Sequence, residues 1–156
     1  MRWRVIAVGT RLGGWAQAAY NDYARRLRGA EALELCEVPP GRRSARGDVV
    51  RAIAAESRAI LALLEPRSFT VALDERGRQF SSVQLGEWLA VRRQAGATLN
   101  FVIGGPDGLG AEVLSRAALR FSLSSLTLPH ALARVLLAEQ LSRATTLLAG
   151  HPYHRE

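Results

Sequence analysis

The sequence contains no lysine, and its net charge of +7 comes from 21 arginines set against 14 acidic residues. Without lysine, a Schiff-base nucleophile and the lysine of a P-loop nucleotide site are both excluded. An arginine excess favours nucleic acid as a partner, because the guanidinium binds phosphate through two hydrogen bonds and stacks on bases. The charge alone is a weak signal, since many basic proteins bind no nucleic acid.

Cysteine is represented by Cys36 alone, which excludes an internal disulfide and a zinc site built from thiolates. It alternates with Leu33, Leu35 and Val38 in a strand-like run, so a buried structural thiol explains it more simply than a nucleophile does. The histidines near the C-terminus lack the H-E-x-x-H spacing, and we expect no metal site.

Long apolar runs are also lacking. Those at residues 59–64 and 135–138 are far too short to span a bilayer, and the N-terminal run is too short for a signal-peptide core. We therefore expect a cytoplasmic protein without a membrane segment. A length of 156 residues suits one domain, so we expect residues 1–156 to form a single domain.

Short β runs alternate with helical runs along the chain. Strands are predicted at residues 3–8, 33–38, 69–73 and 98–103 and from Phe121, and a last helix from Pro129 to about residue 148. Ser81 and Gln84 have the spacing of a capping box. This alternation predicts an α/β fold, a parallel sheet with helices on both faces. Two apolar helix faces are expected, one with Trp15, Ala19, Tyr23 and Leu27 and one with Val50, Ile53, Ile60, Leu61 and Leu64.

Ligands of an open parallel sheet bind beyond the carboxyl ends of its strands, where three segments are candidates. These are Leu73 with Asp74, the glycine loop 104–110, and residues 122–129. The glycine loop is either a ligand-binding loop or a tight strand-to-helix turn. Residues 124–129 are either an adenine-binding loop or a buried strand. His130, at the start of the last helix, is a packing or capping residue or a catalyst.

Two segments do not suit a core. Residues 39–47 form a basic loop with Arg42, Arg43 and Arg46, which we expect to bind RNA phosphates; the alternative is a solvated surface. The tail after Gly150 is either a disordered end or a set of groups able to stack on a base and hold a phosphate.

Four motifs resemble the ribosomal RNA large subunit methyltransferase H (RlmH) family of SPOUT enzymes, and the resemblance covers the whole chain. They are Val5-Ile6-Ala7-Val8-Gly9-Thr10, Ile103-Gly104-Gly105-Pro106-Asp107-Gly108-Leu109, Leu123-Ser124-Ser125-Leu126-Thr127-Leu128-Pro129-His130, and His151-Pro152-Tyr153-His154-Arg155-Glu156. The last two together are highly specific, whereas the glycine loop alone is not.

The resemblance implies a single SPOUT methyltransferase domain with a C-terminal trefoil knot, a homodimer and no metal. It also implies methylation of N3 of a pseudouridine in 23S ribosomal RNA of the ribosome, with S-adenosyl-L-methionine as the methyl donor. Carried over to this sequence, the residues expected to bind the cofactor are Leu73, Asp74, Gly104, Gly105, Ser124, Ser125, Leu126, Thr127, Leu128 and Pro129.

The acceptor nitrogen in such a reaction is an imide that still carries its proton, so a group must remove the proton or stabilise the anion. No pair of acidic residues is placed for this task, whereas the tail concentrates suitable groups. We expect His154 and Arg155 to lie near the target base, with Tyr153 packed beside it.

Two other interpretations are open. A basic RNA-binding module without catalysis explains the charge and the tail but leaves residues 124–129 without a role. A nucleotide- or NAD-dependent enzyme explains the glycine loop, but the G-x-G-x-x-G fingerprint is missing after the first strand.

Deleting residues 153–156 should abolish methyl transfer while the affinity for S-adenosylmethionine stays largely unchanged. Labelled methyl transfer and calorimetric binding, made on the same preparation, test this. Unchanged turnover in the truncated protein would remove the tail from the mechanism.

Overall fold

The computed structural model describes residues 2–150, and its strands are β1 (Trp3–Val8), β2 (Leu33–Val38), β3 (Phe69–Gln79), β4 (Leu99–Ile103) and β5 (Leu119–Ser122). They form one sheet in the order β2-β1-β4-β3-β5, and every neighbouring pair is parallel. The predicted parallel sheet is confirmed. Three strand bounds differ, since β3 continues well beyond residue 73, β4 begins at Leu99 rather than residue 98, and β5 begins at Leu119 rather than Phe121.

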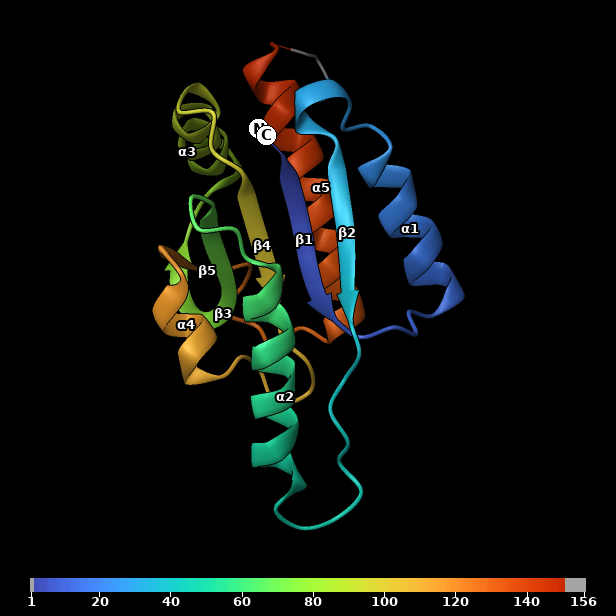
Figure 1. Ribbon diagram of the computed structural model, residues 1–156. Helices are drawn as coiled ribbons and strands as arrows, with labels where there is room; N and C mark the ends of the chain where they lie inside the picture. Colours follow the sequence, from blue (N-terminus) through green and yellow to red (C-terminus); the bar gives the residue numbers. More distant parts are fainter. Residues whose placement is uncertain (1, 151–156) are drawn as a thin grey trace.

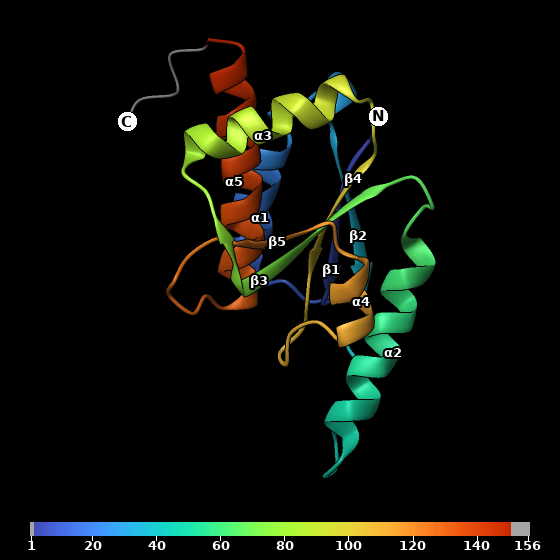
Figure 2. The same ribbon diagram turned by 90° about the vertical axis from the view of Figure 1, so that its left-hand side faces the viewer.

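Helices cover both faces of the sheet, as predicted. They are α1 (Gly14–Ala24), α2 (Asp48–Leu63), α3 (Ser82–Gln94), α4 (Ala111–Arg116) and α5 (His130–Leu148), with a short 3₁₀ turn at Gly29–Glu31. In the ribbon of Figure 1 the strands run side by side, and in the turned view of Figure 2 α1, α3 and α5 lie on one side of them and α2 and α4 on the other.

Alternation along the buried strands divides the core in two. Trp3, Val5 and Ala7 of β1 belong to the cluster that packs against α3 and α5, whereas Ile6 and Val8 point to the α2 and α4 side. All five side chains are buried. A strand that is covered on both faces must be apolar at successive positions, which is why residues 5–8 show no polar alternation.

The predicted apolar faces of α1 and α2 are confirmed only in part, since Leu27, Ile60 and Leu64 are buried, whereas Trp15 and Val50 are not. Trp15 is 62% exposed, and α1 instead buries Ala16 and Tyr20. Val50 is 75% exposed. The buried residues of α2 are Ala52, Glu56, Ser57 and Ile60. A spacing of four fits several faces of a helix equally well, and packing on the sheet or on α5 selects one of them. The N-terminal part of α2 also extends past the sheet (Figure 1), which leaves its first apolar residues in solvent.

Local signals, by contrast, predicted two helix starts correctly. The Ser81 hydroxyl accepts a hydrogen bond from the Gln84 amide at 3.1 Å, and the Gln84 side chain accepts one from the Ser81 amide at 2.9 Å, which completes the capping box. Pro129 directly precedes the first residue of α5. No helix among residues 2–150 has the length and apolar character needed to cross a membrane.

Candidate functional site

A cavity of about 790 Å³ lies at the carboxyl edge of the sheet. Its walls come from residues 73–76 of β3, the loop after β4 (103–109), the end of β5 with the following loop (120–124 and 126–130), Leu114 and Ala133. Because all strands are parallel, each of these segments leaves the sheet at the same edge. The volume is in the range of small-molecule sites, about 300–1,000 Å³.

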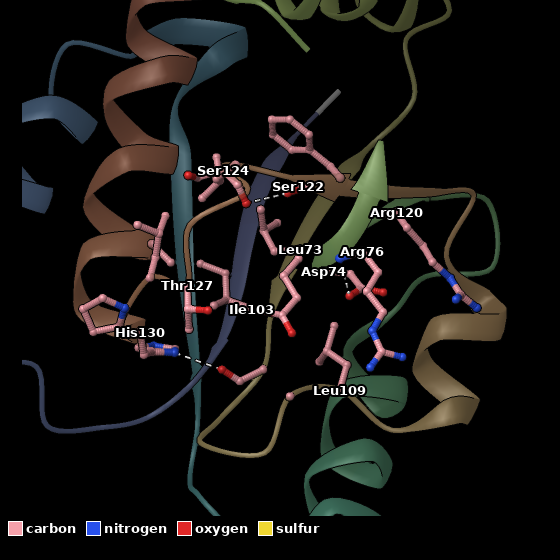
Figure 3. A pocket seen from close by; sticks show the side chains of 18 of the residues that line it. Leu73, Asp74, Arg76, Ile103, Leu109, Arg120, Ser122, Ser124, Thr127 and His130 are labelled. Carbon is pink, nitrogen blue, oxygen red and sulfur yellow. Dashed lines mark hydrogen bonds between the residues drawn. The ribbon is translucent and has the colours of Figure 1, made fainter. Parts of the chain in front are cut away.

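The three segments singled out in the sequence meet at this cavity. All the predicted cofactor residues except Ser125 line it, namely Leu73, Asp74, Gly104, Gly105, Ser124, Leu126, Thr127, Leu128 and Pro129. Figure 3 shows Thr127 and His130 on one side and Arg76 and Arg120 on the other. Sequence reasoning did not place Arg76, Arg120 or His130 in this wall.

Arg76 reaches the cavity through an irregularity in β3 that the sequence did not indicate. Leu73 and Arg78 both have Phe121 as their partner on β5, so residues 74–77 leave the ladder between them. The Asp74 carboxylate accepts a hydrogen bond from the Arg76 amide at 3.1 Å, which stabilises the bend. A side chain at Gly77 would have its Cβ 2.6 Å from the Arg120 backbone, so only glycine allows this approach of β3 to β5.

Residues 123–129 form neither a helix nor a strand, so the buried-strand interpretation is wrong. The loop holds its shape by short-range hydrogen bonds. The Ser122 hydroxyl donates to the Ser124 carbonyl at 2.9 Å, and the Ser124 hydroxyl accepts from the Leu126 amide at the same distance (Figure 3 shows the first). The Leu126 side chain is 72% exposed. The loop therefore presents backbone and apolar groups to the cavity without being part of the sheet.

The glycine loop after β4 is folded tightly on itself. Gly105 and Gly108 pair across it, with a hydrogen bond of 3.1 Å from the Gly108 amide to the Gly105 carbonyl. A Cβ on Gly104 would lie 2.6 Å from the Gly108 backbone. The loop is therefore a tight turn that also forms a wall of the cavity, and its role in ligand binding stays a prediction.

The basic loop is anchored to the glycine loop through Arg43. The Arg43 guanidinium binds the buried Glu56 carboxylate at 2.7 and 3.1 Å and the Asp107 carboxylate at 2.7 Å. The Gly41 amide also donates to Glu56, at 2.7 Å. The hydrogen bond to Glu56 raises the pKa of Arg43. Arg43 thus differs from the solvated phosphate-binding group we expected, whereas Arg42 and Arg46 are exposed.

His130 connects the start of α5 to the glycine loop. Its Nδ1 lies 2.9 Å from the Gly104 carbonyl oxygen (Figure 3), and its Nε2 lies 2.9 Å from an Arg134 nitrogen. Burial, assisted by the charge of Arg134, lowers the pKa of His130 below 6.5, against the opposing effect of the Gly104 hydrogen bond. The neutral imidazole is therefore the form that the fold favours.

Among residues 2–150 no three histidine, cysteine or acidic side chains are grouped so as to hold a metal ion. Cys36 is partly buried on β2, 3.5 Å from a nitrogen of Arg4, away from the cavity residues. The expected catalytic residues Tyr153, His154 and Arg155 lie outside the described residues.

Comparisons with known proteins agree with this picture. Residues 1–154 match the family model described as "Predicted SPOUT methyltransferase". Proteins named ribosomal RNA large subunit methyltransferase H are similar over their full lengths. The one from Thiobacillus denitrificans is 49% identical, with 100% of both chains covered, and the one from Azotobacter vinelandii is 47% identical, covering 99% of this chain and 100% of the relative.

Solved structures share the fold at low identity. A probable methylase family protein from Haemophilus influenzae has a TM-score of 0.59 at 15% identity, covering 99% of this chain and 70% of that one. A protein from Legionella pneumophila, described as a "putative methyltransferase" and solved with the cofactor SAM bound, has a TM-score of 0.51 at 8% identity, covering 92% of this chain and 66% of that one.

The depressed pKa of His130 predicts a pH dependence of stability. The folded protein binds the His130 proton more weakly than the unfolded chain does, so the contribution is fully present above pH 6.5 and is lost as the pH falls below it. Between pH 7 and pH 5, the melting temperature of the native protein should fall more than that of a His130→Asn variant, which has no titrating group there. Equal falls in the two proteins would show that His130 titrates alike in both states.

Proposed function

We propose, since the chain belongs to the SPOUT methyltransferase family, that it methylates large-subunit ribosomal RNA with S-adenosylmethionine as the donor. The resemblance that the sequence motifs carry narrows the target to N3 of a pseudouridine in 23S ribosomal RNA. Such an enzyme works where ribosomes are, in the cytoplasm. The observation that carries the proposal is the cavity, where the motif residues of three distant segments form one wall.

The cavity suits S-adenosylmethionine in size and in chemistry. Apolar side chains such as Leu73, Ile103 and Leu128 match the faces of an adenine ring. The loop of residues 123–129 is free of strand pairing and offers backbone groups for the adenine edge. The Asp74 carboxylate matches the positive charges of the cofactor.

When bound, the cofactor supplies a methyl group that is already activated by the sulfonium. The protein's contribution is therefore orientation and the exclusion of water. The tight glycine loop and the hydrogen-bonded Ser122–Ser124–Leu126 turn make rigid walls for this purpose. Arg76 and Arg120 stand at the cavity and can receive RNA phosphates there. We assign removal of the acceptor proton, or stabilisation of the anion, to His154 and Arg155, with Tyr153 packed beside the base.

We place two copies of the chain in the active enzyme. Several apolar side chains at and near α5 are exposed, namely Leu126, Leu132, Leu136 and Leu148, whereas Leu141 of the same helix is in the core. A homodimer that covers the exposed set would remove them from water. The trefoil knot stays a prediction from the family resemblance.

Calorimetric titration of S-adenosylmethionine tests the cavity. A Thr127→Trp substitution adds an indole to an exposed lining residue, so it should weaken binding roughly tenfold or more by occupying ligand space. Ala54→Trp, on the exposed side of α2, is the matched control and should bind as the native protein does. Unchanged affinity in Thr127→Trp would move the cofactor site elsewhere. Labelled methyl appearing in 23S ribosomal RNA of isolated ribosomes then tests the substrate.

The basic loop gives a second test. Replacing Arg42 or Arg46 with alanine should weaken RNA binding alike for any sequence and flatten its salt dependence by about one unit per lost phosphate contact. Arg43→Ala should instead lower the melting temperature, because it leaves the buried Glu56 carboxylate without its cation. RNA binding measured at several salt concentrations distinguishes arginines that contact phosphates from an arginine that only stabilises the fold. An unaltered salt slope in Arg42→Ala and Arg46→Ala would make this loop a solvated surface.

A further inference from the structure

We propose that Arg134 is a positioning residue of the cofactor cavity, acting through His130 on the backbone carbonyl of Gly104. The inference rests on the placement of the cofactor in that cavity. Arg134 itself does not line the cavity, and its side chain is 1% exposed.

Arg134 joins three elements at the carboxyl edge of the sheet. From α5, its guanidinium donates to the Glu37 carboxylate of β2 at 2.7 Å and to the Gly9 carbonyl, just after β1, at 3.2 Å. A third contact reaches Nε2 of His130 at 2.9 Å, one turn earlier on the same helix. The charge is therefore buried with a carboxylate partner and further acceptors, as a buried arginine requires.

These contacts determine the tautomer of His130. A guanidinium has donors only, so Nε2 of the imidazole must be the acceptor in their hydrogen bond. The proton of the neutral ring is then on Nδ1, which lies 2.9 Å from the Gly104 carbonyl oxygen and donates to it. Without Arg134, the imidazole could place its proton on either nitrogen, and one of the two forms has nothing to donate to Gly104.

The Gly104 carbonyl matters because it controls a peptide plane in the cavity wall. The peptide between Gly104 and Gly105 is planar and trans, so turning the carbonyl toward His130 turns the Gly105 amide the opposite way. Both glycines line the cavity, and neither has a side chain to restrict the plane. The Arg134–His130 pair supplies that restriction from outside.

A purely structural role would not require a charge at position 134. Buried ion pairs replaced by apolar side chains of similar volume often leave stability unchanged or increased. An apolar residue at position 134, however, has no hydrogen-bond donor for Nε2 of His130. The geometry therefore assigns Arg134 to the orientation of the loop and not only to the core.

Substitutions at the two positions separate these roles, with S-adenosylmethionine affinity measured by calorimetry and the melting temperature as a second readout. Arg134→Met should weaken binding roughly tenfold, the factor expected for one lost hydrogen bond in a site. His130→Asn keeps a donor near the position of Nδ1 and should bind within about threefold of the native protein, whereas His130→Gln should lose roughly tenfold.

The double variant His130→Asn/Arg134→Met distinguishes a positioning role of Arg134 from a structural one. An asparagine amide donates whatever its neighbour is, so Arg134→Met should have little effect on affinity in the His130→Asn background. A merely structural arginine would instead give the same loss in both backgrounds. Should Arg134→Met not fold, the double variant Arg134→Met/Glu37→Gln replaces it, because it removes the donor to His130 without leaving the Glu37 carboxylate unpaired.

Arg4→Met is the matched control. Arg4 is also a buried arginine, but it lies at the amino ends of the strands, where it donates to the Leu63 carbonyl at 2.8 Å. Its loss should lower the melting temperature and leave cofactor affinity unchanged. Native affinity in Arg134→Met, or an equal loss in both backgrounds, would overturn the inference. Native affinity in Thr127→Trp would reject the cavity assignment instead.

Discussion

Parallel pairing of every strand is the constraint on which the rest of this structure depends. It sends each connection across a face of the sheet, which is why helices cover both sides and why β1 and β4 are apolar at successive positions. It also brings the carboxyl ends of β1, β3 and β4 to one edge. There the chain leaves the ladder at Gly9, at residues 74–77 and at Gly104, and backbone groups become available to a ligand.

Two arginines hold this edge together, and both do so through the glycine loop. Arg43 ties the basic loop to Asp107 while neutralising the buried Glu56. Arg134 ties β2 and the end of β1 to His130, which contacts Gly104. The Arg134 guanidinium and the Glu56 carboxylate are charges taken out of water, a costly arrangement unless hydrogen-bonding partners surround them. The result is a loop of small residues held at both ends, which suits a wall that must keep its shape around a flexible cofactor.

Much of the fold could be predicted because its signals are local. The apolar run of residues 3–8 is a strand whatever surrounds it, and Ser81 with Gln84 form their capping box within one turn. The site segments were predictable for a related reason, since Gly104 directly follows β4 and Thr127 lies in the loop after β5. The buried face of α1 was not predictable. Trp15 and Ala16 are neighbours on a weakly amphipathic helix, and only the packing of α1 on α5 decides that the alanine is inside.

The sequence by itself determined the parallel α/β class, the three segments that form the cavity and the arginine-based charge. Only the tertiary structure decided which arginines are available for RNA and which are structural. Arg43 and Arg42 are adjacent and alike in the sequence. Arg43, however, is ion-paired with Glu56 and Asp107, whereas the Arg42 side chain is exposed to solvent. Arg134 pairs with Glu37, 97 residues away. An ion pair of that separation leaves no periodicity or spacing in the sequence, because its geometry exists only once β2 and α5 have been brought to the same edge of the sheet.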